Sequence, residues 1–227
     1  MADTGTATPR ERYRAQIRAE IKEHAWQQIA TTGASALSLN AIAKQMGMSG
    51  PALYRYYANR DELITELIRD AYRSLADTLR STAEKAAEKA AEKAAEGGGL
   101  TGLAHAVRGW ALRDPQRYLL IYGTPVPGYH APDDITAISS QIMTLLLDAA
   151  SAVPEPRNPG TPLDHHLAAH RDWAGDHPAP PAVLHRALSF WTRIHGVLSL
   201  ELAGHFAGMG FDPALLFAAE LDDLLSP

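Results

Sequence analysis

Histidine and aspartate side chains gather in one short stretch of the chain, at Asp164, His165, His166 and His170. His166 and His170 lie four residues apart, a spacing that lets two imidazoles bind one Zn²⁺ if the stretch is helical. Such a site would make the protein a metal-dependent or hydrolytic enzyme. The stretch lies among prolines, however, and lacks the glutamate general base of an HExxH sequence. We therefore assign no catalytic residue, no metal ligand and no cofactor, and keep a metal-dependent enzyme as the alternative.

A second chemistry, recognition of DNA bases, is indicated by SLNAIAKQMGMSGPALYRYY at residues 38–57. Its first half carries an apolar stripe at helical spacing, formed by Leu39, Ile42, Ala43 and Met46. Gly47 can supply the left-handed residue that ends this helix. Ser49 can cap a second helix, in which Leu53 and Tyr57 share the inward face. The pattern predicts a helix-turn-helix, which presents its second helix to a DNA major groove.

Side chains on the outward face of this second helix are the candidates for DNA contact. Arg55 is the one long donor there, and its guanidinium suits the O6 and N7 acceptors of guanine, although a phosphate contact would suit it equally. Tyr54 and Tyr56 suit phosphates or a thymine methyl group, and the remaining residues would position the domain without reading bases. The candidate DNA-binding residues are Ser38, Lys44, Ser49, Gly50, Pro51, Ala52, Tyr54, Arg55, Tyr56, Asn59 and Arg60.

Helices on both sides are expected to position the helix-turn-helix. An apolar repeat every four residues predicts an amphipathic helix over about residues 10–32, ended by Gly33, and this repeat consists of Ile17, Ile21, Ala25 and Ile29. After the recognition helix, Asn59 is a good N-cap and Glu62 stands where a capping box needs it. The helix that follows should continue through the repeat AEKAAEKAAEKAAE, whose residues favour helix, until three glycines end it.

The rest of the chain also reads as helices. We expect them at residues 101–112, 115–122, 133–153 and 182–208, and from 213 onward. Residues 154–181 hold seven of the 15 prolines and predict a long loop, with about one helical turn at 164–173. The last two helices are apolar on more than one face, so we expect them to pair with those of a second subunit. Strand-like alternation is absent from the sequence, and the predicted fold class is all-α.

Aromatic residues on these later helices are candidates for binding a small molecule. They fall at helical spacings on segments that should face one another, although such stripes also form ordinary cores. Few charges share these helices, which favours an apolar and planar ligand. The candidate ligand-binding residues are Trp110, Tyr118, Tyr122, Met143, Trp191 and His195.

Charge and composition agree with DNA binding by one end of the chain. The net charge is −5. Residues 1–60, however, carry eight basic and four acidic groups, whereas the remainder carries thirteen basic and twenty-two acidic groups. Cysteine is absent, which excludes disulfides and thiolate sites. A polar N-terminus and the lack of a long apolar run predict a cytoplasmic protein that makes no membrane contact.

Residues 21–63 resemble the N-terminal domain of TetR-type transcriptional regulators. The resemblance depends on Ile21, Ala25, Ile29, Gly33, Leu39, Ile42-Ala43, Met46-Gly47-Met48-Ser49, Leu53-Tyr54, Tyr56-Tyr57, Arg60 and Leu63. Arg60 replaces the commoner lysine, while His24 and Gln28 stand where apolar residues are usual. In addition, Trp191, His195 and Gly196 resemble a TetR subgroup that has a C-terminal Trp-His-Gly motif.

The resemblance implies a homodimer that binds a palindromic operator in double-stranded DNA and is released by a small-molecule effector. We expect residues 1–58 to form the N-terminal tail and the DNA-binding domain, and residues 59–227 to form a helical regulatory domain that binds ligand and dimerises through its last two helices. The predicted protein is thus a repressor and not an enzyme. A ligand-independent DNA-binding protein is a further alternative.

Overall fold

The computed structural model describes residues 8–92, 98–123, 129, 132–153 and 160–225. Within these ranges every regular element is helical, which confirms the all-α prediction. Contacts divide the described chain into two units, one reaching to Arg69 and including Tyr129, the other comprising the remainder from Asp70. None of the described helices is both long enough and apolar enough to cross a membrane.

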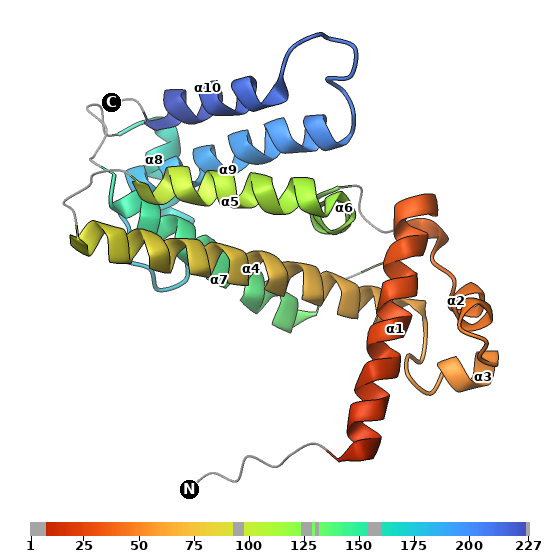
Figure 1. The fold of residues 1–227 in the computed structure, drawn as a ribbon. Coiled ribbons are helices and arrows are strands. Elements are labelled where there is room, and N and C mark those ends of the chain that lie inside the picture. The colour runs from red at the N-terminus through yellow and green to blue at the C-terminus, as the bar shows by residue number, and fades with distance from the viewer. Residues whose placement is uncertain (1–7, 93–97, 124–128, 130–131, 154–159, 226–227) are drawn as a thin grey trace, which may run out of the picture. The chain divides into compact units, whose positions relative to one another are not determined.

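The first unit is a small helical cluster (Figure 1). Its elements in chain order are α1 (Pro9–Thr32), η1 (Ala34–Ala36), α2 (Leu39–Gln45), α3 (Gly50–Leu53) and the start of α4 (Arg60–Glu92). Thr8 and Glu11 form a capping box at the beginning of α1, and Gly33 ends the helix as predicted. Ile21, Ala25 and Ile29 are the buried residues of α1, so most of the predicted stripe is confirmed.

The turn between α2 and α3 has the geometry expected from Gly47. This glycine has φ +66°, and the N–H groups of Gly47 and Met48 donate to the carbonyls of Lys44 and Ala43 at 3.2 and 2.8 Å. These two bonds are those of a Schellman motif, which satisfies the last carbonyls of a helix. The chain thereby turns sharply and directs α3 away from the axis of α2.

The recognition helix is shorter than predicted. Regular α-helix ends at Leu53, and the next turn closes through bonds from Arg55 N to Ala52 O at 3.3 Å and from Tyr56 N to Leu53 O at 2.8 Å. Such i→i−3 bonds tighten a final helical turn. Ser49 occupies the N-cap position, but its side chain makes no capping hydrogen bond within the described part of the chain. Leu53 and Tyr57 are fully buried, as predicted for the inward face.

The second unit is a helical bundle (Figure 1). After the later part of α4, it contains α5 (Gly98–Arg113), α6 (Pro115–Tyr122), α7 (Asp133–Ser151), α8 (Pro162–Ala169), η2 (Asp172–Ala174), α9 (Pro181–Leu202) and α10 (Pro213–Leu225). Helix α9 contacts α5, α6, α7, α8 and α10, and its buried residues include Phe190 and Ile194. It is therefore the central helix of the bundle.

Several predicted boundaries in this unit are wrong. The glycines expected to terminate α4 do not all lie in a linker, because Gly98 and Gly99 form the first turn of α5. A Cβ added to Gly99 would lie 3.4 Å from the Cβ of Ala149, so glycine allows α5 and α7 to approach closely here. The end of the EKAA repeat, at residues 93–96, lies outside the described residues.

The predicted loop and the predicted end of α9 also differ from the structure. The described part of residues 154–181 contains a two-turn helix, α8, whose start is fixed by a capping box between Thr161 and Asp164. Helix α9 ends at Leu202 and not at Gly208, because Gly204 adopts a left-handed conformation with φ +77°. The later part of α7 buries Leu146, Leu147 and Ala150.

Replacing Gly47 with alanine should lower the free energy of unfolding by about 1 kcal/mol, because a Cβ strains a left-handed backbone. A Cβ at this position would meet nothing within 4 Å, so the cost is conformational and not a clash. Gly109→Ala is the matched control, since Gly109 lies inside α5 with equally open space. Chemical denaturation should show stabilisation by up to about 1 kcal/mol for the control, and equal effects of both changes would contradict the prediction.

Candidate nucleic-acid interface and effector site

Most of the candidate DNA-binding residues lie at the surface of the first unit. The exposed candidates are Lys44, Ser49, Pro51, Tyr54, Arg55 and Asn59. The half-buried candidates are Ser38, Gly50, Ala52, Tyr56 and Arg60. The short side chains of α3 therefore leave its backbone open to close approach, while Arg55 extends beyond them.

Arg55 combines a free side chain with a fixed backbone. Its guanidinium has no hydrogen-bond or ion-pair partner among the described residues, so its donors are available to a guanine edge or a phosphate. Its carbonyl oxygen accepts a hydrogen bond from Arg14 Nη2 at 3.3 Å. The residue that we expect to read a base is thus presented from a turn that the first helix holds in place.

Arg18 makes the stronger contact to the same turn. Its Nη1 donates to the Tyr56 carbonyl at 2.9 Å, and its guanidinium carbon lies 4.3 Å from the centre of the Tyr57 ring. Its Nη2 also lies 3.5 Å from the Glu66 carboxylate on α4. The carbonyls at a helix end lack partners within the helix, and Arg14 and Arg18 supply them here. We did not identify these two arginines as site residues from the sequence, although their spacing of four places them on one face of α1.

Three polar side chains fix the ends of the neighbouring helices. Ser38 Oγ accepts from Ala41 N at 3.3 Å and caps α2, while Ser38 N donates to Gln28 Oε1 at 3.0 Å. Asn59 Oδ1 accepts from Glu62 N at 2.8 Å. The unusual polar residue at position 28 therefore has a structural partner, and the predicted cap at Asn59 is confirmed.

Arg60 is engaged within the protein. Its Nη2 donates to the carbonyls of Ala34 and Ser35 at 2.8 and 3.3 Å, and its Nη1 lies 3.4 Å from the Asp61 carboxylate. The side chain keeps 30% of its surface exposed. Arg60 thus ties η1 to the beginning of α4, and its expected contact with phosphate remains a prediction.

In the second unit, four of the six candidate ligand-binding residues come together in one aromatic cluster, formed by Tyr118, Tyr122, Trp191 and His195. The His195 ring centre lies 4.0 Å from that of Trp191, 4.3 Å from that of Tyr122 and 5.5 Å from that of Tyr118. The Tyr118 hydroxyl lies 2.9 Å from His195 Nδ1 and 3.0 Å from Ser199 Oγ. Trp191 and His195 share a face of α9, as their spacing predicted.

Burial keeps the aromatic cluster uncharged. It lowers the pKa of His195 to about 4, so the imidazole is neutral at neutral pH. Burial likewise raises the pKa of Tyr118, although the hydrogen bond with Ser199 opposes this, and raises the pKa of Tyr122 well above its usual value. The cluster therefore offers stacking and dispersion to a neutral ring system.

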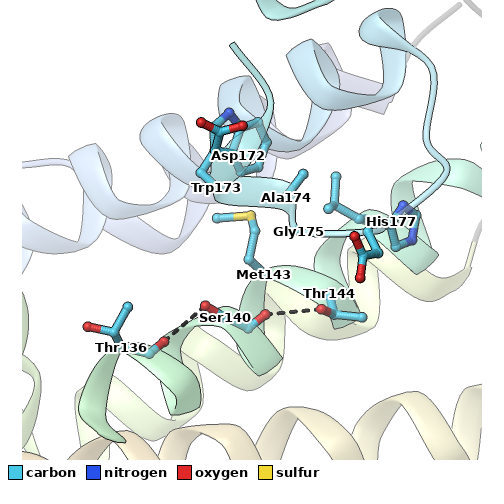
Figure 2. Close-up of a pocket in the computed structure, with 11 residues that line it drawn as sticks. Thr136, Ser140, Met143, Thr144, Asp172, Trp173, Ala174, Gly175 and His177 are labelled. Carbon is cyan, nitrogen blue, oxygen red and sulfur yellow. Dashed lines mark hydrogen bonds between the residues drawn. The ribbon is translucent and has the colours of Figure 1, made fainter. Parts of the chain in front are cut away.

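The other two candidates lie apart from this cluster. Trp110 is buried and donates from Nε1 to Ser74 Oγ at 3.1 Å, which is a core role. Met143 lines a hollow of about 440 Å³ between α7 and residues 172–177. Figure 2 shows its side chain extending from α7 toward Trp173. Sequence reasoning missed the remainder of this hollow, because residues 172–177 were expected to belong to a loop.

The residues of the alternative metal site have other partners. Asp164 is buried and accepts hydrogen bonds from the N–H groups of Thr161 and Gly160 at 2.7 and 3.2 Å, and it pairs with His185 Nδ1 at 2.9 Å. Burial alone would raise the pKa of this carboxyl, but the hydrogen bonds from Thr161, His185 and Gly160 outweigh it and lower the pKa to about 2.

The histidine pair does not complete a metal site. The exposed rings of His166 and His170 stack with their centres 4.0 Å apart. Within the described part of the chain, no group of three or more His, Cys, Asp or Glu residues could hold a metal ion. The metal-dependent alternative therefore has no support from the described residues.

Comparison with known proteins decides the family. The model described as "Bacterial regulatory proteins, tetR family" matches residues 21–67, and that of a "Tetracyclin repressor-like, C-terminal domain" matches residues 100–224. The chain is also 36% identical over 230 residues to the HTH-type transcriptional regulators Rv1816 of Mycobacterium tuberculosis and Mb1846 of Mycobacterium bovis, across 97% of this chain and 95% of theirs. This chain belongs to the TetR family.

Solved structures agree with this assignment. The crystal structure of SCO4313, a candidate regulatory protein, is 66% identical and superposes with a TM-score of 0.83, covering 97% of this chain and 100% of that one. A protein of unknown function from Rhodococcus sp. RHA1 shares the fold at 18% identity, with a TM-score of 0.64 over 99% of this chain and 97% of that one. This TetR-family protein is a DNA-binding transcriptional regulator. Membership of the Trp-His-Gly subgroup stays a prediction.

Arg18→Met should lower the free energy of unfolding by about 1–2 kcal/mol, because it leaves the Tyr56 carbonyl without its charged donor. It should also weaken operator binding without changing the dependence of affinity on salt, since Arg18 acts on the protein and not on phosphate. Arg10→Met, at an exposed position on the same helix, should change stability by less than about 0.5 kcal/mol. A lower salt dependence for Arg18→Met would show that Arg18 contacts phosphate instead.

Acidification from about pH 6.5 to pH 4 should destabilise the second unit. The unfolded state takes up a proton on His195 near pH 6.5, whereas the folded state resists protonation until about pH 4. The contribution of His195 to the free energy of unfolding is therefore complete above pH 6.5. It falls by about 3 kcal/mol as the pH drops from 6.5 to about 4. His195→Gln should remove this component in denaturation experiments across the pH range, with the exposed His165→Gln as control, and an unchanged pH dependence in His195→Gln would refute the assignment.

Proposed function

We propose that this TetR-family protein is a ligand-responsive repressor that binds a palindromic operator as a homodimer. The observation that carries the proposal is the exposed Arg55 side chain, whose backbone carbonyl is held by Arg14. An arginine presented from a short element with small neighbours suits direct contact with guanine in the major groove. Pro51 and Tyr54 flank it at the surface.

Dimerisation is proposed to occur through α9 and α10. Large apolar side chains remain exposed on these helices and on their connection, namely Leu200, Met209, Phe211 and Leu215, of which Leu215 is 70% exposed. Large exposed apolar side chains on neighbouring elements are typical of protein interfaces. A two-fold dimer places its two recognition elements on half-sites about one helical turn of DNA apart, or a little more.

We propose two functional domains with the predicted boundaries. Residues 1–58 form the tail and the DNA-binding domain, and residues 59–227 form the regulatory domain. We propose that the regulatory domain binds a small effector with an apolar or aromatic skeleton, and that binding releases the operator. The neutral aromatic cluster and the hollow that contains Met143 are the features that support an effector of this kind. Bound to the chromosome, such a regulator acts in the cytoplasm.

Arg55→Ala should reduce discrimination between operator and scrambled DNA by about 1–3 kcal/mol, because it removes a bidentate contact to a base. Affinities for both DNAs are measured by fluorescence anisotropy over a range of salt concentrations. Lys44→Ala is the matched control, since an exposed lysine that contacts only phosphate affects both DNAs alike and lowers the salt slope by about one.

Equal losses of affinity for operator and scrambled DNA in Arg55→Ala would instead show that Arg55 contacts phosphate.

Footprinting of the parent protein tests whether it binds DNA as a homodimer. Protection of two symmetric half-sites is expected, and protection of a single asymmetric half-site would contradict the dimer.

A further inference from the structure

The hollow beside α7 has two walls of different character. One wall is the face of α7 that carries Thr136, Ser140, Met143, Thr144 and Leu147, and the other is residues 172–177, which include η2 (Figure 2). Met143 and Trp173 are half-buried and Leu147 is fully buried, so apolar surface lies at its floor. The volume of about 440 Å³ falls within the usual range for small-molecule sites, about 300–1,000 Å³.

Several polar side chains around this floor can accept hydrogen bonds. Asp172 and Asp176 contribute exposed carboxylates. The hydroxyl of Ser140 donates to the Thr136 carbonyl at 3.0 Å, and that of Thr144 donates to the Ser140 carbonyl at 3.1 Å. Because each hydroxyl has one hydrogen, already donated within α7, each has only acceptor lone pairs left for a ligand.

The ring nitrogens of His177 and the guanidinium of Arg171, beside the hollow, are already hydrogen-bonded. His177 Nδ1 accepts a hydrogen bond from Ala179 N at 3.1 Å, so the ring proton is on Nε2, which lies 3.1 Å from Asp148 Oδ1. The neighbouring Arg171 guanidinium donates to the carbonyls of His177 and Ala179 and thereby holds the segment. Neither lysine nor arginine occurs among the described residues that line the hollow.

We infer that this hollow binds an organic cation, with an ammonium group near Asp172 and Asp176 and an apolar or aromatic body against Met143 and Trp173. The carboxylates attract the charge, the half-buried indole offers a face to the cation, and the thioether and Leu147 contact the body. The inference deepens the proposed ligand response by giving the effector a positive charge, and it rests on that proposal. The proposed cation site differs in its chemistry from the neutral aromatic cluster, in which four rings pack on one another.

Three probes of similar size test the charge requirement on the full-length protein by isothermal titration calorimetry. Benzyltrimethylammonium is cationic, N-benzylacetamide is neutral and phenylacetate is anionic. The cation should bind about tenfold more tightly than either of the others, because two aspartates are among the residues that line the hollow. Equal or tighter binding of the amide or of phenylacetate, or the lack of binding by any probe at millimolar concentration, would overturn the inference.

Variants of the lining residues test whether the cation binds in this hollow. The double change Asp172→Asn and Asp176→Asn should weaken cation binding about tenfold and leave amide binding unchanged, whereas Asp77→Asn, an exposed aspartate of α4 that pairs with Arg80, should match the parent. The Met143 methyl resonance, identified by its loss in Met143→Leu among the five methionines, should shift with the cation. A cation preference that survives in the double variant, or an unmoved Met143 signal, would refute the site.

Operator release is measured separately, so that the two proposals can fail independently. Cation binding that requires both aspartates but leaves operator affinity unchanged would support the site and refute its role in ligand-relieved repression. Operator release by neutral compounds, with no aspartate-dependent cation binding, would support ligand-relieved repression and refute the cation site.

Discussion

The DNA-binding end of this protein depends on how the last turn of the recognition element is held. Regular helix in α3 covers only Gly50–Leu53, and a helix of one turn has no stability of its own in water. Burial of Leu53 and Tyr57 holds its inner face, and Arg18 holds its carbonyl end from α1. Since Arg18 also pairs with Glu66, the same guanidinium joins three helical segments. Arg55 can be both exposed and well placed because its carbonyl accepts a hydrogen bond from Arg14, beside the one that Arg18 donates to Tyr56.

The second unit contains two places with opposite chemistry. The aromatic cluster of Tyr118, Tyr122, Trp191 and His195 is uncharged, because burial disfavours the charged form of each of its titratable groups. The hollow beside α7 is lined by hydrogen-bond acceptors and by two aspartates. Helix α9 carries Trp191 and His195, and it contacts both α7 and α10. The helix that we expect at the dimer interface therefore packs on the helix that lines the hollow.

Local signals in the sequence located many helix ends correctly. The prolines at positions 115 and 213 stand at real helix starts, and Gly33 and Gly47 stand at real ends. These signals work because a cap or a left-handed turn depends on a few neighbouring residues. Gly98 and Gly99 misled the prediction because both lie in the first turn of α5, where Gly99 allows a close approach to Ala149, fifty residues away in the chain.

The candidate sites likewise combine features set by neighbouring residues with features set by contacts between distant parts of the chain. By itself the sequence determined the all-α class, the helix-turn-helix with its outward Arg55, and the pairing of Trp191 with His195, since each follows from helical periodicity or adjacent residues. Only the tertiary structure showed that Arg14 and Arg18 hold the recognition turn, that Arg60 bonds the carbonyls of η1, and that Met143 belongs with residues 172–177 rather than with the aromatic cluster. These contacts join side chains to groups far away in the chain, and no local periodicity or capping preference specifies such pairs.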